Sequence, residues 1–165
     1  MLRKIVSGGQ TGVDQAALEA ALDAGLAAGG WCPPGRACEG GVIPERFPLN
    51  ETPRERSEHA PGIPRSLRSE WNVRDADATL VLSRATDPED PGTAFTQRWA
   101  RQLGRPLLVV DPRDPTSADR IRAWLHHHAV AVLNVAGPSE GHAPGIATVA
   151  RTLLRALFSE SAAAG

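Results

Sequence analysis

Three glycine-rich segments of the chain have the composition of loops that bind phosphate groups. The first runs Ser-Gly-Gly-Gln-Thr-Gly-Val-Asp from Ser7 to Asp14. Glycine lets the backbone turn tightly and approach a ligand, and a following helix start offers unpaired amides and the positive end of its dipole. The segment has neither the Gly-Lys-Ser/Thr of a P-loop nor a G-x-G-x-x-G spacing. Its candidate binding residues are Gly8, Gly9, Gln10, Thr11, Gly12 and Asp14.

The other two segments lie later in the chain, at 91–96 and 134–141. Their candidate binding residues are Gly92, Thr93, Thr96, Asn134 and Gly137. Each segment follows an apolar run and leads into a helical pattern, so the three loops should converge at the carboxyl edge of a parallel sheet, where open α/β sheets bind ligands. For each loop taken alone, an ordinary strand-to-helix turn without a ligand is the alternative.

A fourth motif, Glu70-Trp-Asn-Val-Arg-Asp-Ala-Asp77, directly precedes an apolar run. Arg74 is a candidate phosphate partner, held in place by Asp75 or Asp77, because guanidinium groups bind phosphate in a fixed fork geometry. The alternative is a helical turn with a surface ion pair, which would add little stability.

Short apolar runs alternate with helical patterns in the elements that must position these loops. Strands are expected at 5–6, 78–82, 107–110 and 130–135, with a weaker one around 27–31. Helices are expected from Thr11 to Gly25 with a capping box of Thr11 and Asp14, and then at 93–103, from 116 or 117, and from 144. The alternation predicts a Rossmann-like three-layer αβα sandwich around a mainly parallel sheet of about five strands.

The segment 33–76 interrupts this alternation. It has little periodicity, half of the 14 prolines of the chain and seven arginines. Long segments without structure are rare in compact domains, and Trp31, Phe47 and Trp71 give this one apolar side chains to bury. We therefore expect a folded binding flap within one domain at 1–160, followed by a frayed tail at 161–165.

Composition excludes several classes of protein. A net charge of −1 gives no field that would attract nucleic acid or an anionic membrane. No apolar stretch reaches the ~20 residues of a membrane span, and no signal peptide is apparent, so a cytoplasmic protein is expected. The C-x5-C spacing of Cys32 and Cys38 and the run His126–His128 do not have metal-site geometry, so no tightly bound metal is predicted.

Taken together, six motifs resemble the putative molybdenum carrier family, the circularly permuted YpsA-like branch of the SLOG superfamily of Rossmann-like proteins. The motifs are Gly8–Asp14, Gly30–Pro33, Ile43–Glu45, Glu51–Pro53, Glu70–Asp75 and Asn134–Gly137. The resemblance extends from Lys4 to about Leu157. It implies a Rossmann-like domain that binds a nucleotide-like or pterin-phosphate ligand, carriage of molybdenum cofactor, and a homo-oligomer, either a dimer or a tetramer.

The chain departs from this family in two places. The family usually has Gly-Gly-Thr at the second loop, and here Pro91 replaces the first glycine, which removes one amide donor. The flap between Glu51 and Glu70 is also longer and has no tyrosine. The wider superfamily includes Lonely-guy-type phosphoribohydrolases, whose catalytic glutamate stands where this chain has Thr96, and a hydroxyl cannot replace that carboxylate.

The sequence thus favours a small-molecule binding protein, a carrier or sensor for a phosphorylated ligand such as molybdenum cofactor or a nucleotide, with no catalytic residues. One alternative is a nucleotide-processing hydrolase of the phosphoribohydrolase type that uses Asp14, Glu45 or Glu140. The other is an interaction protein whose flap forms a partner surface. Binding to nucleic acid or membrane is not expected.

Overall fold

The central element of the fold is a five-stranded parallel sheet. The structure is a computed structural model, which describes the backbone of residues 1–163 and the side chains of residues 1–159. Its strand order is β2-β1-β9-β7-β8. The strands are β1 (Lys4–Val6), β2 (Ala27–Gly29), β7 (Ala78–Leu82), β8 (Leu107–Val110) and β9 (Val132–Ala136). The predicted Rossmann-like fold with a parallel sheet of about five strands is confirmed, and each expected strand is present within three residues of its predicted bounds.

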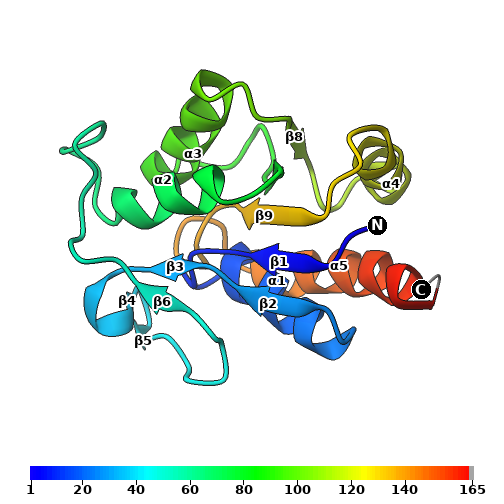
Figure 1. Ribbon diagram of the computed structural model, residues 1–165, viewed down its shortest axis with the longest axis horizontal. Coiled ribbons are helices and arrows are strands. Elements are labelled where there is room, and N and C mark those ends of the chain that lie inside the picture. The colour runs from blue at the N-terminus through cyan, green and yellow to red at the C-terminus, as the bar shows by residue number, and fades with distance from the viewer. Residues whose placement is uncertain (164–165) are drawn as a thin grey trace.

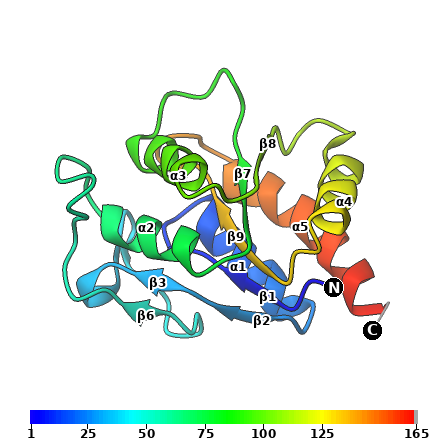
Figure 2. The same ribbon diagram turned by 45° about the horizontal axis from the view of Figure 1, so that its top comes forward.

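Helices cover both faces of the sheet (Figures 1 and 2). One face carries α1 (Val13–Asp23), α4 (Ser117–His127) and α5 (Ile146–Ala163), and the other carries α2 (Ser66–Arg74) and α3 (Pro91–Gln102). The predicted frayed tail falls on the end of α5 and on residues 164–165, which lie outside the described residues. None of the described helices is long and apolar enough to cross a membrane.

The main core lies between the sheet and the α1/α5 layer. It consists of side chains such as Ile5, Leu80 and Leu133 from the strands and Ile146 and Leu154 from α5, all without exposed surface. Strand β7 is buried at every position, which explains why its sequence is continuously apolar rather than alternating. These buried strands fix the positions of the loops at their carboxyl ends.

The flap region folds around a small core of its own. Two short strand pairs, β3 (Trp31–Cys32) with β6 (Asn50–Glu51) and β4 (Ala37–Cys38) with β5 (Gly41–Val42), are joined by the 3-10 turn η1 (Pro34–Arg36). Phe47 and Ile43 pack against Leu18 of α1. The Arg36 guanidinium donates hydrogen bonds to four flap carbonyl groups, so it organises the flap rather than facing a ligand.

Two details differ from the expectations. The N-cap of helix α1 is Gly12, which has no side chain to accept a hydrogen bond. The predicted capping box of Thr11 and Asp14 therefore does not form. Instead, the Thr11 hydroxyl donates to Glu39, and Asp14 accepts from the amide of Gln10. Helix α2 is the second difference, because the sequence indicated at most a helical turn there. Most of its nine residues are polar, and they form no clear apolar stripe.

Candidate functional site

A pocket of about 260 Å³, here called the inner pocket, opens at the carboxyl edge of the sheet. It lies where the chain direction divides: β1 continues through α1 to β2 on one side, whereas β7 continues through α3 to β8 on the other. Such switch points are where open α/β folds bind ligands. The predicted residues that line it are Gln10, Asp14, Gly92, Thr93, Thr96 and Gly137. The sequence-based convergence of the three loops is therefore seen in the structure.

The remaining predicted residues do not line this pocket. They are Gly8, Gly9, Thr11, Gly12, Arg74 and Asn134. Asn134 is buried within the sheet, where its side-chain amide contacts the Thr79 hydroxyl at 3.3 Å. Arg74 lies at the other end of α2, paired with Asp75 at 2.6 Å and 4.8 Å from the Trp71 ring. The surface ion pair, which the sequence left as the alternative, describes Arg74.

Close packing within the protein explains why the loops need glycine. A Cβ at Gly8 would overlap the Arg68 guanidinium, and one at Gly9 would lie 2.7 Å from Ile43. A Cβ at Gly137 would meet the Leu82 carbonyl oxygen at 2.5 Å. Glycine at these positions makes room for neighbouring protein groups. The spacing of glycines in the sequence does not distinguish this reason from the close approach of a phosphate.

The protein's own carboxylates occupy the helix starts that were expected to bind an anion. Asp14 accepts a hydrogen bond from the Gln10 amide before α1, and Asp90 accepts one from Thr93 in α3 at 3.0 Å. Glu140 accepts from the Gly145 and Ala147 amides at the start of α5. A negative group at each of these positions repels a second anion, so a phosphate would have to be bound chiefly by side chains.

Two arginines from the start of α2 supply such side chains. Arg68 Nη1 lies 2.6 Å from Asp14 Oδ2, and both side chains are nearly buried. Burial raises the pKa of the Asp14 carboxyl despite the attraction and hydrogen bond of Arg68. Arg65 also lines the pocket, in a left-handed backbone conformation with φ of 59°, and its side chain has no hydrogen bond or ion pair to any described residue. Such a conformation is uncommon for a residue other than glycine and concentrates at functional sites.

Glu39, which the sequence analysis missed, connects the flap to two of the glycine loops. Its carboxylate accepts hydrogen bonds from Thr11, Ser139 and the amide of Gly141. The hydrogen bond from Thr11 is the largest of the influences that hold the Glu39 pKa below its usual value. Its position in the β4–β5 turn gave no signal, because only the folded flap brings it to the pocket.

Ser139, His142 and Asp90 also meet at the pocket, but they do not form a catalytic triad. Ser139 Oγ lies 2.9 Å from His142 Nδ1, and Asp90 Oδ2 lies 3.8 Å from the same nitrogen. A triad needs the two ring nitrogens for different partners, one to accept the serine proton and one to be oriented by the carboxylate. Here both groups approach one nitrogen, so His142 cannot activate Ser139 in that way.

A family model, the circularly permutated YpsA SLOG family, matches residues 5–158. The chain belongs to this family. It is also similar to a crystal structure of "Putative molybdenum carrier protein" from Syntrophus aciditrophicus SB, with 38% sequence identity and a TM-score of 0.83. That similarity covers 95% of this chain and 94% of the other. Among curated proteins none matches this chain.

In the second glycine loop of this SLOG protein, Pro91 stands where the family usually has glycine. Pro91 occupies the first turn of α3 and has no amide to donate, and Asp90 caps the helix. The Thr96 hydroxyl is buried and donates to the Gly92 carbonyl at 3.0 Å. Of the carboxylates considered for hydrolysis, Glu45 is exposed and lies outside the pocket lining, and Glu140 caps α5.

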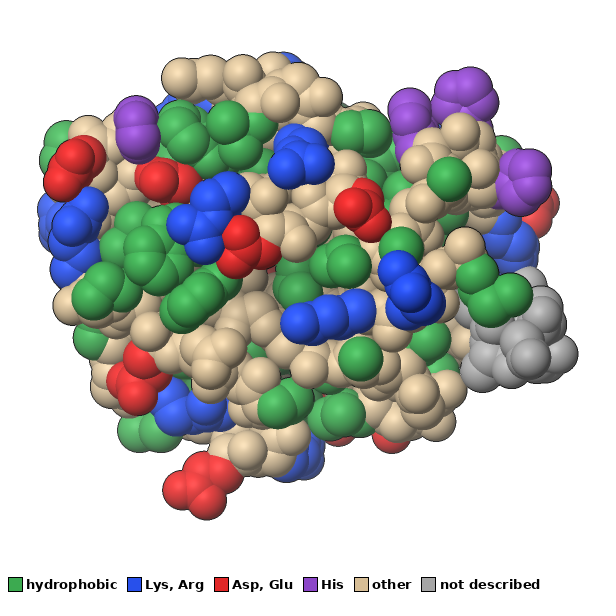
Figure 3. All heavy atoms as spheres, viewed as in Figure 1, with side chains coloured by type: hydrophobic (Ala, Val, Ile, Leu, Met, Phe, Trp, Pro, Cys, Tyr) green, Lys and Arg blue, Asp and Glu red, His purple; other side chains and the backbone are tan. Residues whose placement is uncertain are grey.

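The cysteines of this SLOG protein are buried, and three of its histidines lie together in the chain at 126–128. Cys32 and Cys38 are buried free thiols, and burial raises the Cys32 pKa, which keeps that thiol protonated. Histidine side chains gather over the end of α4 (Figure 3), where the His127 and His128 rings lie 4.7 Å apart. The described residues contain no group of three His, Cys, Asp or Glu side chains that could hold a metal ion.

Proposed function

We propose that the inner pocket binds a phosphate-bearing small molecule and that the chain is a carrier or sensor of that molecule. The observation that carries this proposal is Arg65, whose side chain has no partner in the described part of the chain and which lines a pocket at the switch point of the sheet. Arginine binds phosphate in a bidentate manner. A phosphate-bearing ligand was expected from the sequence, with backbone amides as its binding groups. In this proposal Arg65 binds the phosphate instead.

The charges around the pocket limit the ligand. Arg68 is neutralised by Asp14, so Arg65 remains to bind one phosphate group. Glu39 and Asp90 also line the pocket and place carboxylates on its wall. Carboxylates accept hydrogen bonds from amino groups, which purine bases and pterins carry. A nucleotide-like or pterin-phosphate ligand satisfies both requirements.

Carriage of molybdenum cofactor is the specific form of this proposal that the similar protein's name suggests. Because the described residues offer no group of metal ligands, the protein would recognise the organic, phosphate-bearing part of such a cargo. We further propose that the chain forms a dimer or tetramer, which its mass in solution, measured by light scattering, would test.

The runner-up, a nucleotide hydrolase, is supported only by Asp14, the single carboxylate of the three candidates that lines the pocket. This carboxylate is already engaged by Arg68 and by the Gln10 amide. A general base must be able to reach a proton of the substrate or an attacking water. An engaged, buried carboxylate suits that task poorly, so binding without turnover is favoured.

The test compares Arg65, which precedes α2, with Arg74 at the end of α2, by titration calorimetry with nucleoside monophosphates and a pterin phosphate. Arg65→Gln should weaken binding about tenfold or more, since a charge-assisted hydrogen bond contributes roughly 1.5–3 kcal/mol. Arg65→Lys should retain part of the affinity. Arg74→Gln, which removes the same charge outside the pocket, should leave it unchanged. Equal affinities of Arg65→Gln and the natural protein would overturn the proposal, and native mass spectrometry of the purified protein would identify any ligand that it retains.

A further inference from the structure

A second cavity of about 710 Å³, here called the outer cavity, lies beside the inner pocket, between α3 and α4 and over the carboxyl ends of β7 and β8. Its floor is apolar and includes Ala94, Val109 and Val110. The residues Asp90 and Thr93 line both spaces, and Pro138 of the outer cavity precedes Ser139 of the inner pocket. The two spaces therefore adjoin at the start of α3.

The volumes indicate that one ligand would occupy both spaces. Pockets that enclose a drug-sized ligand usually have about 300–1,000 Å³. The inner pocket, at about 260 Å³, is below this range, whereas the outer cavity is well within it. A molecule larger than a mononucleotide, with its phosphate at Arg65, would therefore extend past Thr93 into the outer cavity.

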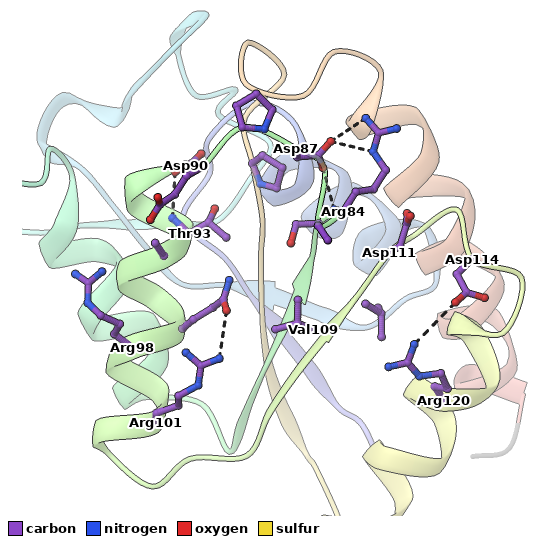
Figure 4. A pocket seen from close by; sticks show the side chains of 18 residues that line it. Arg84, Asp87, Asp90, Thr93, Arg98, Arg101, Val109, Asp111, Asp114 and Arg120 are labelled. Carbon is purple, nitrogen blue, oxygen red and sulfur yellow. Dashed lines mark hydrogen bonds and ion pairs between the residues drawn. The ribbon is translucent and has the colours of Figure 1, made fainter.

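Arginines on opposite walls of the outer cavity supply a second anion site. Figure 4 shows Arg101 of α3 and Arg120 of α4 directed toward the space above Val109. Among the described residues, the Arg101 side chain has a single hydrogen bond, a long one of 3.4 Å to Gln97. Arg120 lies 4.0 Å from Asp114, the limit of an ion pair. Arg84 also lines the outer cavity, but its guanidinium is held by a hydrogen bond and an ion pair to Asp87. The Arg101 and Arg120 guanidinium groups are thus only loosely held by protein partners, so each is available to an anionic group of a ligand.

We propose that the inner pocket and the outer cavity form one two-part site for a dinucleotide-like ligand. Its terminal phosphate binds Arg65, its body covers the apolar floor at Val109, and a second anionic group lies between Arg101 and Arg120. This inference rests on the proposed function of the inner pocket and adds the size and the charge pattern of the ligand.

The experiment measures affinities for the 5′-phosphorylated dinucleotides pApA and pGpG against AMP and GMP. The natural protein should bind at least one dinucleotide tenfold or more tightly than its mononucleotide. The double variant Arg101→Gln/Arg120→Gln should lose this advantage while keeping its affinity for the mononucleotide. Arg113→Gln, which removes an exposed charge outside the cavity lining, is the matched control and should bind as the natural protein does.

The outcomes separate this inference from the function on which it rests. If Arg65→Gln weakens both ligands but no dinucleotide is preferred, the inner pocket binds phosphate and the two-part site is excluded. A dinucleotide preference that survives in the double variant would overturn the role of Arg101 and Arg120. If neither class of nucleotide binds, the two-part site is excluded, and the proposed function also fails if the pterin phosphate does not bind.

Discussion

The Arg68 guanidinium passes over Gly8 to reach the Asp14 carboxylate at 2.6 Å, and a Cβ at Gly8 would occupy the place of that guanidinium. The first glycine of the loop after β1 therefore makes room for an ion pair. Gly8 itself does not have the left-handed conformation that excludes other residues. A substitution there acts through Arg68 alone, which makes the relationship testable.

Gly8→Ala should destabilise the protein by about 1–3 kcal/mol, the usual cost of an added carbon in a packed site. In the Arg68→Ala background the same change should cost little, because the group that it displaces is gone. Urea unfolding of the four proteins gives the coupling energy, expected at roughly 0.5–3 kcal/mol for residues in contact. Additive effects would show that Gly8 is required for another reason.

Arg68→Met should be more damaging at neutral pH than in acid. Removal of one partner of a buried pair costs about 3–5 kcal/mol, because the other charge stays buried. The folded-state pKa of Asp14 is raised by burial, and loss of Arg68 raises it further. Because the natural protein and the variant both favour the protonated carboxyl, the penalty should be smallest near the ordinary value of 3.8 and should grow as pH rises through the raised folded-state pKa of Asp14.

The control for this prediction is Asp14→Asn/Arg68→Met, which removes both charges and leaves an amide oxygen to accept from Gln10. Its stability should exceed that of Arg68→Met at pH 7 and should vary less with pH. Thermal melts from pH 3 to pH 8 make the comparison. A penalty for Arg68→Met that is the same at every pH would contradict the ion-pair explanation and leave only lost packing.

Glu39→Gln should lower the melting temperature slightly at pH 7, since exposed hydrogen bonds and charges contribute little. The folded-state pKa of Glu39 lies below its ordinary value of 4.5, so its contribution is complete above that value and is lost as pH falls through the lower folded-state pKa. The difference between variant and natural protein should therefore shrink below pH 4.5. A difference for Glu39→Gln that stays constant across this pH range would count against the assigned bonds.

The sequence predicted the sheet and the convergence of its loops because both depend on local patterns. Continuous apolar runs such as 78–82 indicate strands buried on both faces, and Gly25 and Gly104 end their helices with positive φ as expected. Gly137 directly follows β9, and Asp14 and Thr93 lie in the first turns of the helices that follow β1 and β7, so all three reach the pocket at the carboxyl edge of the sheet.

What the sequence did not predict depends on contacts across long distances in the chain. The motif around Asp75 and Asp77 singled out Arg74, and no local pattern marked Arg65 or Arg68. In the structure Arg65 and Arg68 line the pocket near the start of α2, whereas Arg74 lies at the far end of that helix. Glu39 reaches the pocket only through the fold of the flap. Asp90 and Glu140 accept hydrogen bonds from the helix amides that were expected to bind an anion. These bonds are seen only in the folded structure.

The last prediction is that this protein does not release free base from nucleoside monophosphates. Cleavage of the N-glycosidic bond develops positive charge on the ribose, which a nearby carboxylate stabilises. At the corresponding position Thr96 presents a hydroxyl that is buried and already donates to the Gly92 carbonyl. It supplies neither the negative field nor a useful acid or base near neutral pH. Asp14 lines the same pocket but is held by Arg68.

Base release from purine and cytokinin-type nucleoside monophosphates, measured by chromatography, is expected to match the background without protein. Thr96→Glu introduces the missing carboxylate, and Thr96→Gln has the same bulk without the charge, so any turnover gained by the first variant alone reports the effect of the charge. Efficient turnover by the natural sequence would overturn the proposal of a binding protein. Asp14 would then be the residue to replace next, because it is the pocket carboxylate that directly follows the first glycine loop.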